Sequence, residues 1–175
     1  MKDEWVDFIL HPSSFILLSM PTIYEGSFAP PSGRFALIAA RFNSAIVEPL
    51  VAGALDALKR HGVADDAIDL VRVPGSFEIP LTAQRLADSG KYAAVICLGA
   101  IIRGDTDHYD YVAGEAAGGV ARAALATNVP VIFGILTCDT LEQAINRAGA
   151  KAGNKGFDAA LTAIEMVNLL RNLPK

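Results

Sequence analysis

Residues Gly99–Val112 (GAIIRGDTDHYDYV) bring together the side chains of this sequence best suited to chemistry. They follow an apolar run, Tyr92–Leu98, and precede a small-residue stretch, Ala113–Ala126, which is predicted to be a helix. A buried strand that ends in a polar loop before a helix offers free backbone N–H groups and the positive end of the helix dipole, so phosphate is a natural ligand. The loop also carries His108, the side-chain type best suited to proton transfer near neutral pH.

The same residue types also occur in loops without a ligand. Glycine, aspartate and threonine are common turn residues, and a single histidine is more often a surface or packing residue than a catalyst. From this stretch alone, an anion site at Asp105 and Thr106 and a simple connecting loop therefore both remain open.

Composition narrows the class of protein. A chain of 175 residues suits one domain with a sizeable core. Its hydrophobic fraction of 52% suggests apolar surface buried between subunits. The net charge of −4 and the lack of a basic run argue against nucleic-acid binding. Cys97 and Cys138 fit reduced thiols of a cytoplasmic protein, and no Cys/His spacing predicts a metal site.

Residues 1–20 differ from the remainder and are predicted to be a disordered extension of a single domain, residues 21–175. The apolar runs Phe8–Leu10 and Phe15–Met20 are too short to span a membrane. Acidic residues near the start also argue against a signal peptide.

Strand-like and helix-like segments alternate from Thr22 onward, which predicts an α/β fold: a three-layer α/β/α sandwich around a parallel sheet. Ser44 is expected to cap the first helix. The predicted strands are Ile23–Phe28 (a short N-terminal edge strand), Arg34–Ala40, Ile68–Val73, Tyr92–Leu98 and Val129–Thr137. The predicted helices are Ser44–His61, Glu78–Ser89, Ala113–Ala126, Thr140–Ala148 and Asn154–Asn172.

The segments that follow the strands should meet at one edge of such a sheet, where ligands bind. They include Arg41–Asn43, Pro74–Glu78, Gly99–His108 and Thr137–Asp139. Phe42 and Phe77 come to the same edge as His108 and could form a platform for a flat ring. The alternative is that both aromatic side chains cover the core.

Several motifs in this order make the chain resemble the lumazine synthase family from about Ile23 to Leu173. They are Arg41-Phe42-Asn43, Val71–Pro80 (VRVPGSFEIP), Gly99–Val112, Phe133–Gly149 (FGILTCDTLEQAINRAG) and Gly153–Met166 (GNKGFDAALTAIEM). The resemblance implies a flavodoxin-like sheet. It also implies a transferase that condenses 5-amino-6-(D-ribitylamino)uracil with 3,4-dihydroxy-2-butanone 4-phosphate. The products are 6,7-dimethyl-8-ribityllumazine, phosphate and water, in the penultimate step of riboflavin biosynthesis, and the family uses no metal or organic cofactor.

The resemblance also implies roles for individual residues. His108 matches the acid/base histidine, while Asp105, Thr106 and Arg147 match the phosphate-binding positions. The pyrimidine and ribityl chain would be bound by Phe42, Asn43, Gly75, Ser76, Phe77, Glu78, Ala100, Ile101, Ile102, Phe133 and Lys155. In the family, Phe133, Arg147 and Lys155 reach the site from the neighbouring subunit. On residue type alone, Arg147 would be a cation at a helix C-terminus and Lys155 a solvated lysine at a helix start.

Three positions depart from the family pattern. Phe77 stands where many relatives have tryptophan, Asp107 is more acidic than the small residue or proline often found before the histidine, and Asp158 replaces a frequent glutamate. These three departures are expected to affect the rate and the pH optimum of the reaction.

Other functions are also compatible with the pocket. They are a non-catalytic flavin or lumazine carrier and a mainly structural shell protein.

The resemblance implies an assembly built from homopentamers. Ile23–Phe28 is expected to add to the sheet edge of a neighbouring subunit. The connection Gly149–Gly156 has no insertion, as in members that pack into an icosahedral sixty-subunit shell, so a 60-mer is expected rather than a free pentamer. Riboflavin synthase is a further expected partner, while nucleic acid and membrane are not expected partners.

Overall fold

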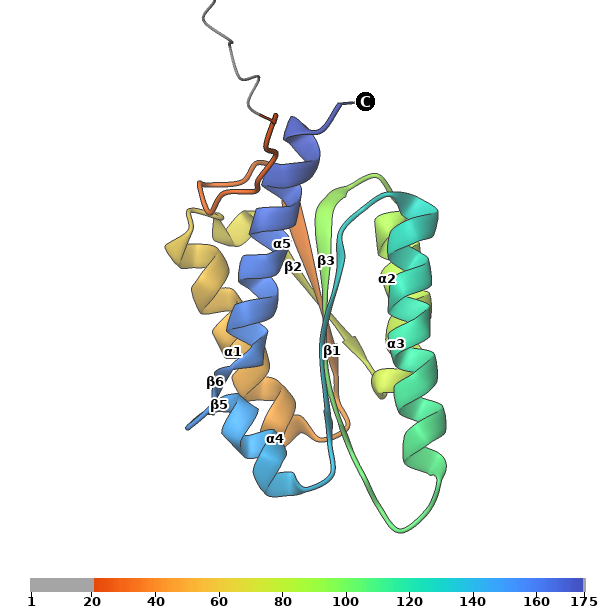
Figure 1. The fold of residues 1–175 in the computed structure, drawn as a ribbon. Helices are drawn as coiled ribbons and strands as arrows, with labels where there is room; N and C mark the ends of the chain where they lie inside the picture. The colour runs from red at the N-terminus through yellow and green to blue at the C-terminus, as the bar shows by residue number, and fades with distance from the viewer. Residues whose placement is uncertain (1–20, 175) are drawn as a thin grey trace, which may run out of the picture.

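The computed structural model describes residues 21–174, so the expectation for residues 1–20 lies outside the described residues. A parallel four-stranded sheet in the order β2-β1-β3-β4 forms the middle layer. Helices α1 and α5 cover one face, and α2 and α3 cover the other (Figure 1). The predicted three-layer, parallel, flavodoxin-like architecture is confirmed.

The elements alternate along the chain much as the sequence predicts. The strands of the main sheet are β1 (Arg34–Ala40), β2 (Ile68–Val73), β3 (Tyr92–Ile102) and β4 (Val131–Cys138). The helices are α1 (Ser44–Arg60), α2 (Ile79–Ala87), α3 (His108–Thr127), α4 (Leu141–Arg147) and α5 (Lys155–Asn172). Short 3-10 turns lie at Asp65–Ala67 and Ser76–Glu78, and the small strands β5 (Ala148–Ala150) and β6 (Gly153–Asn154) join α4 to α5. None of the helices in residues 21–174 is long and apolar enough to cross a membrane.

The core lies on both faces of the sheet, which explains why the strands are almost entirely apolar. In β1, Phe35, Leu37 and Ala39 pack toward α1 and α5. The alternate residues Ala36, Ile38 and Ala40 pack toward α2 and α3. All of these side chains are fully buried. The sheet thus provides a rigid base whose strand ends can position a site.

The predicted N-terminal strand Ile23–Phe28 is not formed in the single chain. The segment lies along the far end of α5, where the Asn168 side-chain amide donates to the carbonyls of Ser27 (2.7 Å) and Ala29 (3.0 Å). It forms no strand ladder because β1, to which the segment leads, already pairs with β2 and β3 on its two edges. The two edge strands of the sheet are β2 and β4, and the segment pairs with neither of them.

Several predicted boundaries also need correction. Ser44 is the first residue of α1 and not its cap; Asn43 occupies the cap position in the left-handed region (φ 58°), which asparagine tolerates better than most residues. Strand β3 continues past Gly99 to Ile102 because β4 pairs with it along that stretch. Helix α3 begins at His108 and not at Ala113, so the loop is shorter than expected.

A close crossing of α1 and α5 fixes the start of α5. The Asn154 side-chain oxygen accepts hydrogen bonds from the backbone N–H groups of Gly156 (2.9 Å) and Phe157 (3.2 Å). Its amide nitrogen donates to the Pro49 carbonyl inside α1 at 2.8 Å. A Cβ atom on Gly156 would lie 2.0 Å from the backbone oxygen of Leu50. The crossing therefore requires glycine here.

A cluster of four polar side chains joins the N-terminal ends of β1, β2 and β3. The Asp69 carboxylate accepts hydrogen bonds from Lys91 Nζ (2.8 Å), the Tyr92 hydroxyl (2.7 Å) and Arg34 Nη2 (2.9 Å). Because these donors favour the ionised carboxylate, Lys91 most of all, the pKa of Asp69 lies well below its usual range.

We expect Gly156→Ala to lower the free energy of unfolding by about 2 kcal/mol, since the new methyl group must displace α5 from α1. The matched control is Gly114→Ala in α3, where an added Cβ meets nothing within 4 Å. That variant should raise the free energy of unfolding by about 0.5–1 kcal/mol, because alanine is the better helix former. Urea denaturation measures both. Equal effects of the two variants would contradict the close crossing.

We expect Asp69→Asn to reduce stability in a pH-dependent way. The pKa of Asp69 is lowered in the folded state, so the ionised carboxylate stabilises the fold above the unfolded-state pKa of about 3.9. That contribution is lost as pH falls further. The stability difference between wild type and variant should therefore be present at pH 7 and shrink below about pH 4. Denaturation curves at several pH values test this, with the exposed pair Asp65–Lys59 (Asp65→Asn) as control; a pH-independent difference would count against it.

Candidate active site

The C-terminal part of β3 has a strand neighbour on only one side. Pairing with β1 stops at Ala39 and Leu98, whereas pairing with β4 continues to Ile102 and Cys138. The backbone N–H of Arg103 also points to β4, donating to the Cys138 carbonyl at 2.9 Å. Since backbone groups alternate in direction along a strand, those of Ile102 point to the other side. There the sheet leaves backbone donors and acceptors for a ligand.

A hollow of about 630 Å³, here called the loop hollow, opens beside this unpaired stretch. It lies where the ends of β1, β2 and β3 meet the start of α3, at the edge that the sequence predicts for a ligand. Its lining is Phe42, Asn43, Pro74, Gly75, Ser76, Phe77, Glu78, Ala100, Ile101, Ile102, Gly104, Thr106, His108, Tyr109, Tyr111 and Val112.

Two aromatic side chains of the loop hollow are held out in solvent. Phe42 is 70% exposed and Phe77 is 55% exposed, so neither covers the core. Each follows a strand directly: Phe42 comes after β1, and Phe77 lies in the 3-10 turn after β2. Exposed aromatic faces beside free backbone groups suit a flat, polar-edged ring.

Polar contacts fix the walls of the loop hollow. Asn43 Nδ2 donates to the Ala100 carbonyl at 2.8 Å, which ties the start of α1 to the unpaired side of β3. The Glu78 carboxylate accepts from the backbone N–H of Gly75 at 2.9 Å. Ser76 is the one buried polar residue of the described chain, and a Cβ on Gly99 would come within 2.5 Å of its Oγ. Gly99 therefore allows the 3-10 turn to pack against β3.

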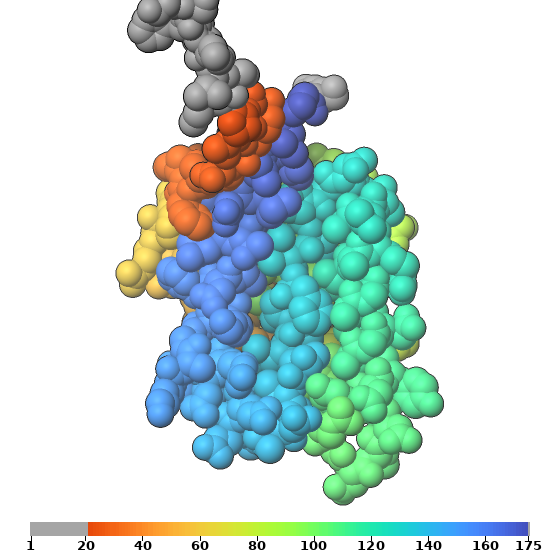
Figure 2. Space-filling model, in the orientation of Figure 1, coloured from red at the N-terminus to blue at the C-terminus, as the bar shows by residue number. Residues whose placement is uncertain are grey.

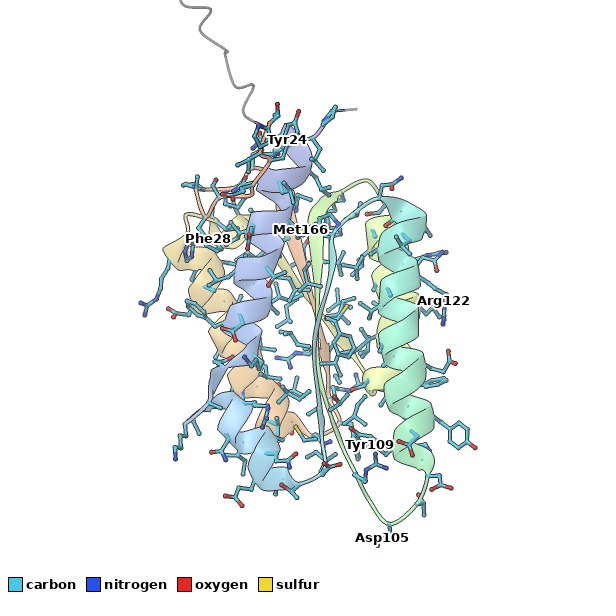
Figure 3. All side chains as sticks on the ribbon, in the orientation of Figure 1. Tyr24, Phe28, Asp105, Tyr109, Arg122 and Met166 are labelled. Atoms are coloured by element: carbon cyan, nitrogen blue, oxygen red, sulfur yellow. The ribbon has the colours of Figure 1, made fainter. Side chains whose placement is uncertain are left out.

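The loop between β3 and α3 projects from the sheet, with Asp105 at its tip (Figure 3). Thr106 and His108 line the loop hollow, whereas Asp105 does not. His108 is exposed and belongs to the first turn of α3, where backbone N–H groups lack intrahelical partners. The histidine therefore lies at the positive end of the α3 dipole, a place that suits an anion.

Three other predicted site residues lie in a separate place, here called the edge hollow. This hollow of about 520 Å³ runs along β4 and the start of α5, and Phe133, Arg147 and Lys155 all line it. Figure 2 shows this edge of β4 open between α5 and α3. Phe133 is 41% exposed, although it lies in the middle of a strand.

The two cations of the edge hollow are anchored in different ways. Lys155 Nζ lies 2.8 Å from the Asp158 carboxylate, one turn along α5. Arg147, the last residue of α4, donates to the Gln143 carbonyl at 3.2 Å, as a cation at a helix C-terminus can. The guanidinium group keeps further donors for a bidentate anion.

The structure thus divides the predicted site residues between two hollows that share no lining residue. Tyr109, Tyr111 and Asp158 also line them and were not among the predicted site residues. Tyr109 and Tyr111 lie within the Gly99–Val112 motif, just after His108, so their closeness to His108 in the sequence could have identified them as site residues. Asp158 could have been found from its spacing to Lys155, three residues apart on one helix face.

Neither cysteine lines the loop hollow or the edge hollow. Burial raises the pKa of both the Cys97 and Cys138 thiols, so both are held as neutral thiols near pH 7. In residues 21–174, no group of three or more His, Cys, Asp and Glu side chains could hold a metal ion. The groups that line the two hollows include aromatic faces, hydroxyls, carboxylates, an imidazole and two cations.

Most of the chain matches the model of a known protein family. The family model described as 6,7-dimethyl-8-ribityllumazine synthase matches residues 32–171 of this 175-residue chain. The match spans both hollows and all elements from β1 into α5.

Proposed function

Because this chain belongs to the 6,7-dimethyl-8-ribityllumazine synthase family of riboflavin biosynthesis, we propose that it catalyses that family's condensation itself. The substrates would be 5-amino-6-(D-ribitylamino)uracil and 3,4-dihydroxy-2-butanone 4-phosphate. The products would be 6,7-dimethyl-8-ribityllumazine, inorganic phosphate and water. The observation that carries the proposal is the loop hollow, which combines an aromatic platform, unpaired backbone groups and a helix start with a histidine.

The aromatic substrate fits the inner part of the loop hollow. Phe42 offers a face for stacking the pyrimidine, and the backbone groups of Ile102 that point away from β4 offer hydrogen-bond partners for its edge. Ser76 and Glu78 supply polar groups for the ribityl chain. Holding two reactants in this way can lower the barrier by about 7–11 kcal/mol, which is the largest contribution proposed here.

His108 is the proposed acid/base. Imine formation, loss of phosphate and ring closure each move a proton, and an imidazole beside the bound substrates could transfer them. A positioned general acid or base contributes about 10²- to 10⁴-fold. The backbone at Asp105 and Thr106, next to the start of α3, is the proposed phosphate-binding segment.

The edge hollow is proposed to complete the site of a neighbouring subunit. Phe133, Arg147 and Lys155 line no part of their own chain's loop hollow. A head-to-tail contact that brings one chain's edge hollow onto the next chain's loop hollow would add a second aromatic wall and a phosphate-binding arginine. Contacts of this kind close into rings, and the homopentamer is the ring proposed here.

A larger shell of twelve such pentamers is the proposed final assembly. The β5–β6 connection between α4 and α5 is a tight antiparallel turn, with positive φ at Gly149 (116°) and Gly153 (75°) and no inserted residues. The product would pass to riboflavin synthase, and both reactions would take place in the cytoplasm.

The decisive assay follows the fluorescence and absorbance of the lumazine when both substrates are supplied to purified protein. We expect product formation without added metal or organic cofactor. A tightly bound yellow ligand at full occupancy, with no lumazine formed, would instead favour a flavin or lumazine carrier.

We expect His108→Ala to lower turnover by roughly ten- to several-hundred-fold, since positioning supplies most of the acceleration and the imidazole adds proton transfer. His108 is exposed, so the variant should keep the stability of the wild type. Steady-state kinetics and a thermal melt measure the two effects. Unchanged turnover would remove His108 from the mechanism.

Arg147→Ala should act mainly on the phosphorylated substrate. Loss of charge-assisted hydrogen bonds predicts an apparent KM raised by about ten- to a hundredfold for that substrate. The KM for the pyrimidine should change far less. Arg60→Ala, which removes another exposed arginine, is the control. An unaltered KM for the phosphorylated substrate would mean that Arg147 does not bind its phosphate.

Mixing the two impaired variants tests whether the site is shared. When His108→Ala and Arg147→Ala chains are unfolded and refolded together, about a quarter of the head-to-tail contacts should pair an intact loop hollow with an intact edge hollow. Activity should therefore recover above that of either variant refolded alone. No recovery in mixed assemblies of the wild-type mass, measured by analytical ultracentrifugation, would place the whole site within one chain.

A further inference from the structure

Arg103 makes an unusual number of contacts for an exposed side chain. Nη2 and Nη1 donate to the two carboxylate oxygens of Asp110 at 3.1 and 3.3 Å. Nε donates to the Asp139 carboxylate at 3.2 Å. The guanidinium carbon also lies 4.0 Å from the centre of the Tyr109 ring. One side chain thus contacts two carboxylates and an aromatic face, and its paired hydrogen bonds to Asp110 use the planar guanidinium fork, a geometry that a lysine ammonium lacks.

These contacts join three elements around the projecting loop. Arg103 directly follows β3, Tyr109 and Asp110 belong to the first turn of α3, and Asp139 directly follows β4. Asp139 also donates its backbone N–H to Gln143 of α4 at 3.0 Å, and α4 ends at Arg147. The Arg103 side chain therefore closes the base of the loop and connects it to the end of β4, just before α4.

The part of the loop beyond this base has little support of its own. Asp105, Thr106, Asp107 and His108 make no side-chain hydrogen bond or ion pair to the rest of residues 21–174, and all four are exposed. A Cβ on Gly104 would meet nothing within 4 Å. In Figure 3, Tyr109 lies at the base of the loop while Asp105 lies at its outer tip. The position of the loop residues must therefore depend on how its base is held.

We propose that Arg103 is a positioning residue that holds the Gly104–His108 loop in its phosphate-binding geometry through Asp110, Asp139 and Tyr109. This inference rests on the proposed function only in naming phosphate as the loop's ligand. The paired side chains are exposed by 43% (Arg103), 60% (Asp110) and 67% (Asp139). Exposed pairs of this kind add little to global stability, but a loop ordered before binding does not lose that freedom when its ligand arrives.

The chain offers a matched control on the same helix. Arg122 pairs with Glu115 at 3.1 Å, again seven residues apart, with both side chains exposed (68% and 64%). Arg122 lies far along α3 from the loop (Figure 3). The variants Arg103→Met and Arg122→Met each remove one exposed guanidinium from an ion pair and keep an unbranched side chain.

The first experiment titrates inorganic phosphate into the assembled protein by calorimetry. We expect Arg103→Met to weaken phosphate binding by about ten- to a hundredfold, since a misplaced binding segment loses that much. Arg122→Met should bind phosphate as the wild type does. Both variants should melt within about 3 °C of each other. Arg103→Lys, which keeps the charge without the fork, should restore less than half of the lost binding free energy.

A second readout needs no ligand. Amide hydrogen exchange at residues 104–108 should accelerate in Arg103→Met and not in Arg122→Met, while exchange in the sheet stays the same. Asp110→Asn is a milder change that removes one charge and keeps the side-chain size. If Arg103→Met folds poorly, this variant tests whether the Arg103–Asp110 pair positions the loop. It should shift loop exchange and phosphate affinity in the same direction.

The outcomes separate this inference from the proposed function. If wild-type protein forms no lumazine while Arg103→Met still loosens the loop and loses phosphate, the positioning role stands and the proposed reaction fails. If the wild type is active but phosphate affinity and loop exchange of Arg103→Met and Asp110→Asn match those of Arg122→Met, Arg103 has no positioning role.

Discussion

The unequal pairing of β3 is the constraint on which the rest of the site depends. A strand buried on both faces normally satisfies its backbone groups by pairing along both edges. Strand β3 does so up to Leu98 and then continues for four residues with β4 alone (Gly99–Ile102). β1 can therefore turn away into α1, and the space that it leaves becomes the loop hollow. Asn43 spans the gap with one hydrogen bond to Ala100, and the backbone beyond it is left for a ligand.

The protein separates the residues that stabilise it from those proposed to act on substrates. The strand residues of β1 are fully buried, whereas Phe42, only two residues beyond β1, is 70% exposed. Removal of the exposed Phe42 or Phe77 ring would therefore open no cavity in the core. The α1–α5 crossing differs, because there an added side chain at Gly156 would disturb the packing. The same crossing positions the neighbouring Lys155 in the lining of the edge hollow.

Local sequence patterns predicted the elements well, because apolar runs and strand-end motifs are local signals. They located the loop before α3, the two exposed phenylalanines and the edge of the sheet at which they meet. They did not predict that β3 would continue through Gly99, since that depends on pairing with β4, a strand about thirty residues away in the sequence. Nor could they show that Phe133 and His108 lie in different hollows of one chain. The Ile23–Phe28 pattern suggested a strand, but a strand also needs a free edge, and local pattern carries no information about that.

Both ends of the described chain lie at the same end of the molecule. The segment leading into β1 is fastened to the last turns of α5 by Asn168 and Arg171. This end is opposite to the projecting loop (Figure 1). Within one subunit, the described chain therefore enters and leaves the domain on the side away from its own projecting loop. A fluorescent label attached at the first or last described residues would therefore be carried at the end of the subunit opposite its own projecting loop.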